Sequence, residues 1–417
     1  MRASRHSPRP EPPRRGESKD IARPATPWPI VFLAIAAGIV GAFQVGKAAM
    51  ALPALRADLG IGLVAAGWVL AIFNLIGVAV GMAIGGLVGR WGDRRTVLAG
   101  LTLLAAASLA GAAAPDIAVL LATRFVEGMG FLMVVVGVPS LIMRLTRPDD
   151  LKLALGAWGA YMPVGQAIMV LAAPLLLVPF GWRGLWAANT VLLAVFAVIL
   201  ARATAALPAA PARPPLSLWR DLADTVTAPG PLLLAAIFGF YSMQYLAVMG
   251  FLPTVLIERE GLGTGTAGAL AALAIAMNGV GNLAAGLLLR HGIRRWLLIA
   301  AAGVAMGSAA LGIFAASPPL WASYALYLAF SGFGGLLPAS VFNAVPAHAP
   351  SRHLVPMTNG LVVQGSNLGQ VIGPPAVGAL ATAIGWQWAP LLIVPAALSA
   401  ALLALVLRRR DGSAANR

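Results

Sequence analysis

Three ionisable residues lie inside long apolar stretches: Lys47 in "QVGKAAMALP" (44–53), and Arg124 and Glu127 in "RFVEGMG" (124–130). A charged side chain within a bilayer costs several kcal/mol unless it faces a polar cavity or pairs with an opposite charge. Glu127 is the only one of the 14 acidic residues that falls inside an expected membrane span. These three residues are therefore the first candidates for a binding or proton-transfer site.

Each of them also has a purely structural interpretation. The stem of Lys47 is long enough to lift its ammonium group to the outer surface. Arg124 and Glu127 are three residues apart, so they can form a salt bridge within one helix. A single glutamate beside an arginine is also a candidate proton site, because burial and the neighbouring cation act on its protonation in opposite directions. The sequence leaves these interpretations open.

The composition places the three residues in a membrane protein. Of 417 residues, 59% are hydrophobic and only 10% are charged, which is too apolar for a soluble core. The net charge of +15 is spread in short clusters between apolar runs, as in membrane proteins and unlike a nucleic-acid-binding patch. The absence of cysteine excludes disulfides and thiol catalysis, and the four histidines lie in tails or at segment ends. We therefore expect no metal site, no cofactor and no nucleic-acid partner.

Twelve stretches are long enough to cross the hydrocarbon, which takes about 20 apolar residues. They are 29–51, 65–89, 96–114, 117–143, 153–178, 184–204, 231–255, 266–289, 296–316, 319–345, 355–381 and 387–407. With both termini in the cytoplasm, nearly all Lys and Arg fall on the cytoplasmic side; the exceptions are Lys47, Arg56, Arg124, Arg183 and Arg259. This bias predicts an all-α, multi-pass protein of the bacterial inner membrane.

The chain divides into two halves of six expected helices. We expect a disordered cytoplasmic tail (1–27), an N-terminal six-helix bundle (28–204), a cytoplasmic linker (205–230), a C-terminal six-helix bundle (231–407) and a cytoplasmic tail (408–417). The halves repeat, because "GGLVGRWGDRRTVL" (85–98) aligns with "AGLLLRHGIRRWLL" (285–298) at an offset of 200. Since six is even, the repeats share one orientation about a pseudo-two-fold axis along the membrane normal, with a substrate site near the midplane between them.

The loop at 85–98 resembles the signature of the major facilitator superfamily, Gly-x-Leu-x-Asp-Arg-x-Gly-Arg-Arg. The matching positions are Gly85, Leu87, Arg90, Gly92 and Arg94, whereas Gly89 stands at the aspartate position and Asp93 at a basic one. "RFVEGMG" is similar to the family's fourth-helix motif, and "VPSLI" (138–142) with "GAW" (156–158) is similar to the cyanate-transporter-type branch. The resemblance implies a monomeric secondary transporter that works by alternating access.

The resemblance also implies roles for particular residues. The loop and its repeat would form a cytoplasmic gate, in which arginines pair with carboxylates or helix ends of the neighbouring half. Its candidate residues are Gly85, Arg90, Gly92, Asp93, Arg94, Arg95, Arg290, Arg294 and Arg295. In this family the first and fourth helices line the central cavity, so Lys47, Arg124 and Glu127 are expected to meet there with one excess positive charge.

Polar residues near mid-span complete the candidate site. The substrate-binding candidates are Lys47, Gln44, Arg124, Gln166, Tyr241, Gln244, Tyr245, Asn278, Gln364, Asn367 and Gln370, and the proton-coupling candidates are Glu127 and Arg124. Any one of them can instead satisfy an interhelical hydrogen bond.

The main functional hypothesis is proton-coupled movement of a small organic or inorganic anion. The first alternative is a drug/proton antiporter that exports amphipathic compounds, and the second is a membrane receptor or scaffold without transport. The chain has no phosphate-binding loop of the Gly-x4-Gly-Lys-Ser/Thr type, which argues against direct use of ATP. We also find no pairing of nucleophile and base that would indicate an enzyme. The expected partners are the bilayer, protons and an anionic small molecule.

Overall fold

The computed structural model describes residues 25–82, 91–207, 218–316 and 318–415, and every regular element among them is a helix. The N-terminal half comprises α1 (Trp28–Leu59), α2 (Leu63–Ala71), η1 (Ile72–Asn74), α3 (Leu75–Val80), α5 (Asp93–Ala112), α6 (Ile117–Leu145), α7 (Leu151–Gly159), α8 (Tyr161–Ala172) and α9 (Pro174–Ala203). The C-terminal half comprises α11 (Pro229–Thr254), η2 (Val255–Arg259), α12 (Thr264–Arg290), α13 (Arg295–Phe314), α14 (Leu320–Gly334), α15 (Leu336–His348), η3 (Arg352–Leu354), α16 (Val355–Ile384), η4 (Trp386–Trp388) and α17 (Pro390–Ala415). Between the halves lies α10 (Leu218–Thr227).

Ten helices among the described residues are long and apolar enough to cross a membrane, and the count is eleven if the bent pair Leu153–Gly159 and Tyr161–Ala172 forms one span. Helix α16 has 30 residues and covers the expected span 355–381. It is not among those ten helices; Gln364, Asn367 and Gln370 are polar residues within it. The structure therefore supports a multi-pass helical protein, and a total of twelve spans stays a prediction.

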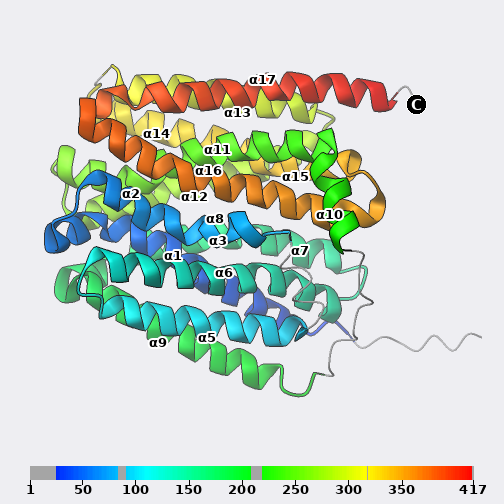
Figure 1. Cartoon of the computed structure of the whole chain (residues 1–417), viewed down its shortest axis with the longest axis horizontal. Helices are drawn as coiled ribbons and strands as arrows, with labels where there is room; N and C mark the ends of the chain where they lie inside the picture. Colours follow the sequence, from blue (N-terminus) through cyan, green and yellow to red (C-terminus); the bar gives the residue numbers. More distant parts are fainter. Residues whose placement is uncertain (1–24, 83–90, 208–217, 317, 416–417) are drawn as a thin grey trace, which may run out of the picture.

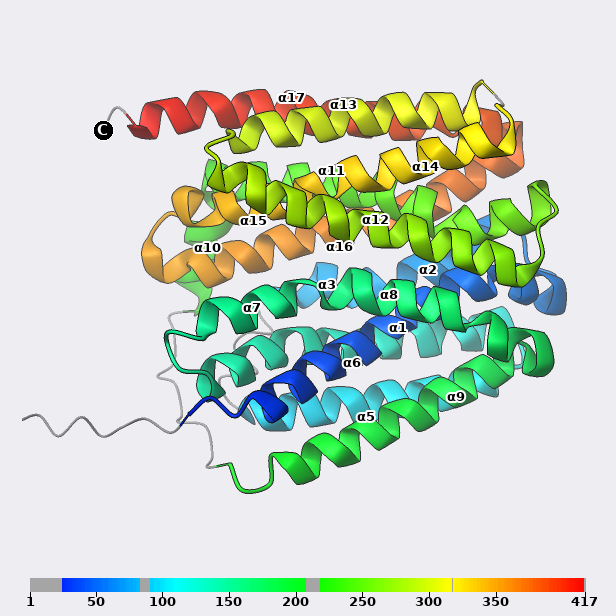
Figure 2. The same cartoon turned by 180° about the vertical axis from the view of Figure 1, so that it is seen from behind.

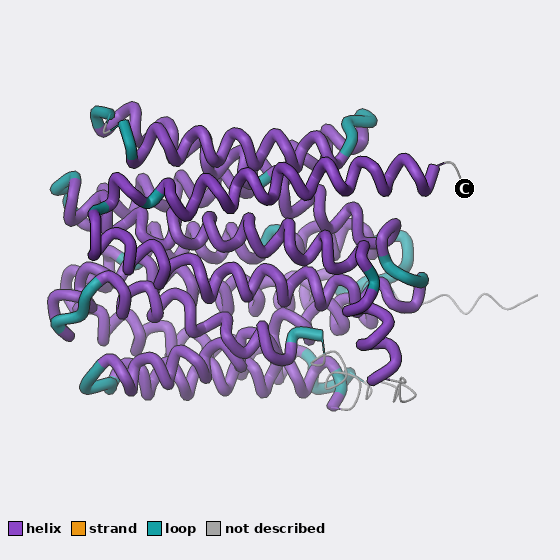
Figure 3. Tube along the Cα trace, turned by 45° about the horizontal axis from the view of Figure 1, so that its top comes forward, coloured by secondary structure: helices purple, strands orange, loops and turns teal. Residues whose placement is uncertain are grey.

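The helices form two groups that run roughly parallel to one another (Figures 1 and 2). The tube in Figure 3 shows loops gathered at the two ends of the helices. Helix α1 begins and α17 ends at the same end of the molecule, which also carries α10 (Figures 1 and 2). We call this the termini-bearing end, and we call the end where α1 finishes and α12 begins the distal end.

Several boundaries differ from those expected. The fifth expected span, 153–178, is bent by 42° at Ala160, between α7 and α8. It then continues into α9, where Gly181 adopts φ 63° and separates the fifth and sixth spans. Only glycine takes up this left-handed conformation without strain. The expected linker 205–230 contains the helix α10, and α17 remains helical through Ala415, within the expected tail.

Glycines allow the helix backbones to approach closely. A Cβ atom on Gly128 of α6 would lie 1.9 Å from the carbonyl oxygen of Phe73, and one on Gly281 of α12 would lie 1.9 Å from that of Gly332. Within a bilayer the hydrophobic effect does not drive helices together, so their association depends on the close packing that small residues allow. The contact of Gly128 with Phe73 holds α6 against η1, and it helps to determine where the charged residues of α6 point.

Candidate functional site

Lys47, Arg124 and Glu127 meet in one buried cluster between α1 and α6. The Nζ of Lys47 lies 2.7 Å from Oε1 of Glu127, and Nη1 of Arg124 lies 2.5 Å from its Oε2. All three side chains are at most 1% exposed. One carboxylate therefore binds both cations, and the cluster carries one excess positive charge.

Further donors and acceptors complete the coordination of the two cations. Lys47 donates to Oγ of Ser108 on α5 at 2.8 Å, and Ser108 in turn donates to the carbonyl of Trp186 on α9 at 3.1 Å. Arg124 donates to the carbonyls of Val69 and Gln44, at 3.2 and 3.1 Å. Five helices of the N-terminal half, α1, α2, α5, α6 and α9, thus hold the cluster, so its geometry depends on tertiary packing.

Aromatic rings cover both cations. The ammonium of Lys47 lies 4.4 Å from the ring centroid of Trp186, and the guanidinium of Arg124 lies 4.6 Å from that of Phe73. Such contacts are worth about 2 kcal/mol when the cation is desolvated. With its ammonium group bound in this way and fully buried, Lys47 does not snorkel to the outer surface in this structure.

Two glutamines at equivalent positions of the halves are buried without a visible partner. Gln44 on α1 and Gln244 on α11 are both 0% exposed. Both polar atoms of each side-chain amide lack a hydrogen-bond partner in the described part of the chain. A buried amide without partners is costly, so Gln44, one turn from Lys47, and Gln244 have free capacity to bind a water molecule or a substrate.

The candidates on α11 and α12 form a separate network in the C-terminal half. Asn278 donates to Oη of Tyr241 at 2.9 Å and to the carbonyl of Ser331 at 3.2 Å. The ring of Tyr245 stacks on that of Tyr241, with 5.5 Å between the centroids. These three residues are therefore close together, and Asn278 and Tyr241 are hydrogen-bonded to each other.

The candidates on α16 lie along the boundary between the halves. Gln364 donates to the carbonyl of Val78 on α3 at 2.9 Å, and Asn367 packs so closely on Gly77 that a Cβ there would lie 2.2 Å from its Nδ2. Gln370 instead donates to Ser366 at 3.0 Å, within its own helix.

The remaining candidate, Gln166 on α8, is 4% exposed. Its backbone carbonyl lies so near Gly46 of α1 that a Cβ there would come within 2.8 Å. Gln166 therefore lies where α8 crosses α1, beside Gly46, which is the residue before Lys47.

Two of the expected gate residues, Asp93 and Arg94, make contacts inside the N-terminal half. Asp93 accepts two hydrogen bonds from Arg144 of α6, at 2.7 and 2.9 Å. Arg94 donates to Oγ1 of Thr204 and to the carbonyl of Ala201, at 2.8 and 2.9 Å, and so caps the end of α9. For Arg94, pairing with the neighbouring half, as expected of the gate arginines, is therefore not the arrangement of this structure.

The other gate candidates are more exposed or lie elsewhere. Gly92 adopts φ 82° at the start of α5, and the side chain of Arg95 is exposed. Gly85 and Arg90 lie outside the described residues. In the C-terminal repeat, Arg290, Arg294 and Arg295 line an open pocket that is described below.

Towards the distal end, the two halves contact one another through apolar residues. Gly250 of α11 packs so closely on Leu70 of α2 that a Cβ there would lie 2.8 Å from its Cδ1, and Met50 and Leu52 of α1 belong to the same buried apolar cluster as Met249 and Leu252 of α11. The last four are residues of the two equivalent segments 44–53 and 244–253. The halves are thus joined on the distal side of the charge cluster.

All three arginines placed outside by the sequence lie at the distal end and are paired with carboxylates. Arg56 binds Glu258 and thereby links α1 to η2, Arg183 binds Asp58, and Arg259 lies 3.8 Å from Glu260. The Arg56–Glu258 pair joins the two halves, whereas the pair of Arg183 lies within one half.

We expect Arg56→Glu to open the distal end and Arg56→Glu/Glu258→Arg to close it again. The pair is partly exposed, so its loss should change folding stability by less than about 1 kcal/mol while shifting the equilibrium between conformations. Spin labels on Ala113→Cys and Gly265→Cys, introduced into this cysteine-free chain, would measure the change as a longer distance between the halves. Arg183→Glu is the matched control, and an identical distance distribution in all variants would contradict the prediction.

Sequence reasoning missed Ser108 and Trp186, which bind Lys47 directly. A serine or tryptophan in an apolar helix is a common residue, and only its rotation toward Lys47 gives it a role. Ser108 is a polar residue within the apolar stretch 96–114, and this was the signal from which its role could have been predicted.

Comparisons with known proteins identify the family to which the chain belongs. The family model described as Major Facilitator Superfamily matches residues 30–354 and 279–417. An uncharacterised transporter of this type from Mycobacterium tuberculosis is 31% identical over 45% of this chain and 32% of its own length. The lincomycin resistance protein of Streptomyces lincolnensis is 29% identical over 43% of this chain and 37% of its own length. The chain thus spans about a third of the length of these curated relatives.

Solved structures share the fold over almost the whole chain. A bacterial homologue of the human lysosomal transporter Spinster gives a TM-score of 0.76 at 14% identity, covering 91% of this chain and 98% of the other. A D-xylose–proton symporter gives 0.74 at 13% identity, covering 91% and 97%. Since the family model spans the described helices and the structural likeness spans both halves, the chain belongs to the major facilitator superfamily, a family of transporters and not of enzymes.

Proposed function

We propose that the protein is a proton-coupled secondary transporter that moves a small anion across the bacterial inner membrane by alternating access. In this proposal twelve helices span the membrane, both termini are cytoplasmic, and a monomer is the working unit. The observation that carries the proposal is the Lys47–Glu127–Arg124 cluster, two cations on one carboxylate with all three side chains buried.

The excess charge of the cluster provides the attraction for an anion. A buried charge without compensation is unfavourable because the low dielectric strengthens electrostatic interactions and removes solvation. A monoanion bound at Lys47 and Arg124 would bring the formal charge of the cluster to zero. The unpartnered amide of Gln44, one turn from Lys47, can supply a directional hydrogen bond to such a ligand.

The same cluster couples the anion to a proton. An anion that takes over contacts of Lys47 and Arg124 competes with the carboxylate of Glu127, and protonation removes the charge of that carboxylate. Anion binding therefore favours proton binding, and by linkage proton binding favours the anion. Mutual reinforcement of this kind leads to symport, whereas a cationic substrate that competes with the proton leads to antiport.

A second candidate function is export of amphipathic drugs. Curated relatives include the lincomycin resistance protein of Streptomyces lincolnensis and the tetracenomycin C resistance and export protein of Streptomyces glaucescens. The partly exposed rings of Trp158 and Tyr161, stacked with centroids 4.1 Å apart, together with the neighbouring ring of Phe131, offer a surface for an aromatic compound. Drug susceptibility in an efflux-deficient host expressing the protein distinguishes the two, because an anion importer confers no resistance.

Transport by purified protein in liposomes that contain a pH-sensitive dye tests the proposal. The probes are cyanate, nitrate, acetate and benzoate, with puromycin as the drug control. We expect at least one anion to enter together with protons, and we expect Lys47→Gln to reduce this flux at least about tenfold, as for loss of one charged contact worth 1.4 kcal/mol or more. Arg183→Gln, at the distal surface, is the control. Normal anion flux through both Lys47→Gln and Arg124→Gln would refute the proposal.

A further inference from the structure

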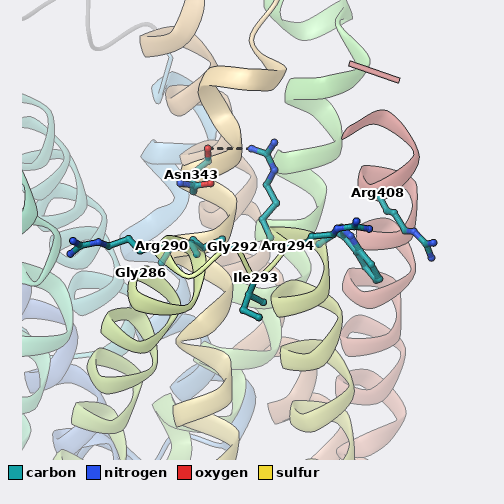
Figure 4. A pocket seen from close by; sticks show the side chains of 11 residues that line it. Gly286, Arg290, Gly292, Ile293, Arg294, Asn343 and Arg408 are labelled. Carbon is teal, nitrogen blue, oxygen red and sulfur yellow. Dashed lines mark hydrogen bonds between the residues drawn. The ribbon is translucent and has the colours of Figure 1, made fainter. Parts of the chain in front are cut away.

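A basic pocket opens at the termini-bearing end of the C-terminal half, away from the charge cluster. It has a volume of about 760 Å³ and lies between the α12–α13 turn, α15 and α17. Four arginines line it, namely Arg290, Arg294, Arg295 and Arg408, and none of the eleven lining residues in the described part of the chain is acidic. Figure 4 shows Arg290 and Arg408 on opposite sides of the pocket, with Arg294 between them.

Two further groups in the pocket suit an anion. Helix α13 begins at Arg295, and no side chain among the described residues caps its N-terminus, so its first backbone N–H groups and its dipole favour negative charge. The indole Nε1 of Trp296 is buried without a hydrogen-bond partner among the described residues. This ring also carries Arg408 at 4.9 Å from its centroid, which holds that side chain at the rim. The pocket therefore combines the positive charge of the arginines with the N-terminal end of α13.

The surroundings of the pocket are those of a membrane interface. Arg290 is the last residue of α12 and Arg295 the first of α13, so the pocket lies where two helices leave the apolar region. Leu289 and Ile293 line the pocket itself, and Ile293 is exposed. A ligand that matches these features carries a phosphate for the arginines and hydrocarbon for these apolar side chains.

We propose that this pocket binds the phosphate headgroup of an anionic phospholipid from the leaflet at the termini-bearing end. Arginine suits this role because its planar guanidinium binds two phosphate oxygens at once. Basic pockets between membrane helices on the cytoplasmic side are a recurrent form of lipid recognition. A lipid bound here would bridge α12, α13 and α17 and hold these helices together at their ends.

The test is native mass spectrometry of the purified full-length protein in detergent with added phosphatidylglycerol. We expect the wild-type protein to retain one phosphatidylglycerol, and Arg294→Gln/Arg408→Gln to retain it with at least about tenfold lower affinity, as expected from about 1 kcal/mol per arginine near an anionic lipid. The single variant Arg408→Gln is compared with its matched control Arg409→Gln, which removes the same single charge from an exposed neighbour on α17 that does not line the pocket. Size-exclusion profiles and circular dichroism confirm that each variant is folded.

Three outcomes would overturn the proposal. Equal loss of affinity in Arg409→Gln and in Arg408→Gln would show that the lipid responds only to the overall charge of the surface. Unchanged binding in the double variant would place the lipid elsewhere. Displacement of the lipid by glycerol 3-phosphate or inorganic phosphate at similar concentration would identify a soluble phosphate compound as the ligand.

Discussion

Replacing Glu127 by glutamine is expected to abolish transport and to destabilise the protein by about 3–5 kcal/mol, the usual cost of breaking a buried ion pair. The substitution leaves two buried cations, Lys47 and Arg124, without the carboxylate that binds both of them. It also removes the group that we propose takes up the proton. The measurements are the midpoint of thermal unfolding in detergent and proton-coupled flux in liposomes.

The double variant Lys47→Gln/Glu127→Gln separates the two roles of Glu127. It removes one positive charge together with the negative one, so a single buried cation remains. We expect it to recover most of the lost thermal stability while transport stays absent. Asp149→Asn, at an exposed position, is the control and should change neither property. A double variant that is less stable than Glu127→Gln alone would show that the two side chains do not share one electrostatic cluster.

Replacing Gly281 by alanine is expected to prevent stable folding of the C-terminal half. The added Cβ would lie 1.9 Å from the carbonyl oxygen of Gly332, and backbone atoms cannot give way as a side chain can. Overpacking costs typically about 1–3 kcal/mol where side chains adjust, and a clash between two helix backbones should lie at or above the upper end. The yield of monodisperse protein after solubilisation is the measurement.

Gly286→Ala on the same helix is the matched control for Gly281→Ala. A Cβ on Gly286 would meet nothing within 4 Å, and alanine has a higher helix propensity than glycine. We expect its yield and thermal stability to equal or slightly exceed those of the wild-type protein. Equal behaviour of the two variants would show that the contact between α12 and α14 does not depend on close approach of the backbones.

The charged candidates could be predicted from the sequence because a charge in an apolar run is conspicuous. Lys47, Arg124 and Glu127 were expected to meet, and they do. The gate residues show the opposite case, since the arginines of the loop were expected to pair with the other half, whereas Arg94 binds the end of α9 and Asp93 binds Arg144 within the same half. A motif specifies which residues are present, but their partners depend on how closely the helices of each half approach in a given conformation.

The sequence by itself determined that the chain is an all-helical membrane protein with a duplicated organisation and three unusual charges. Apolar length, charge bias and an internal offset of 200 residues are properties of the chain that do not depend on packing. Only the tertiary structure decided that Lys47 turns to Ser108 and Glu127 instead of the surface, and that the C-terminal repeat lines a basic pocket. The physical reason is that the rotation of each helix about its axis, and thus the direction of each side chain, is set by contacts with helices distant in sequence, such as that of Gly128 with Phe73.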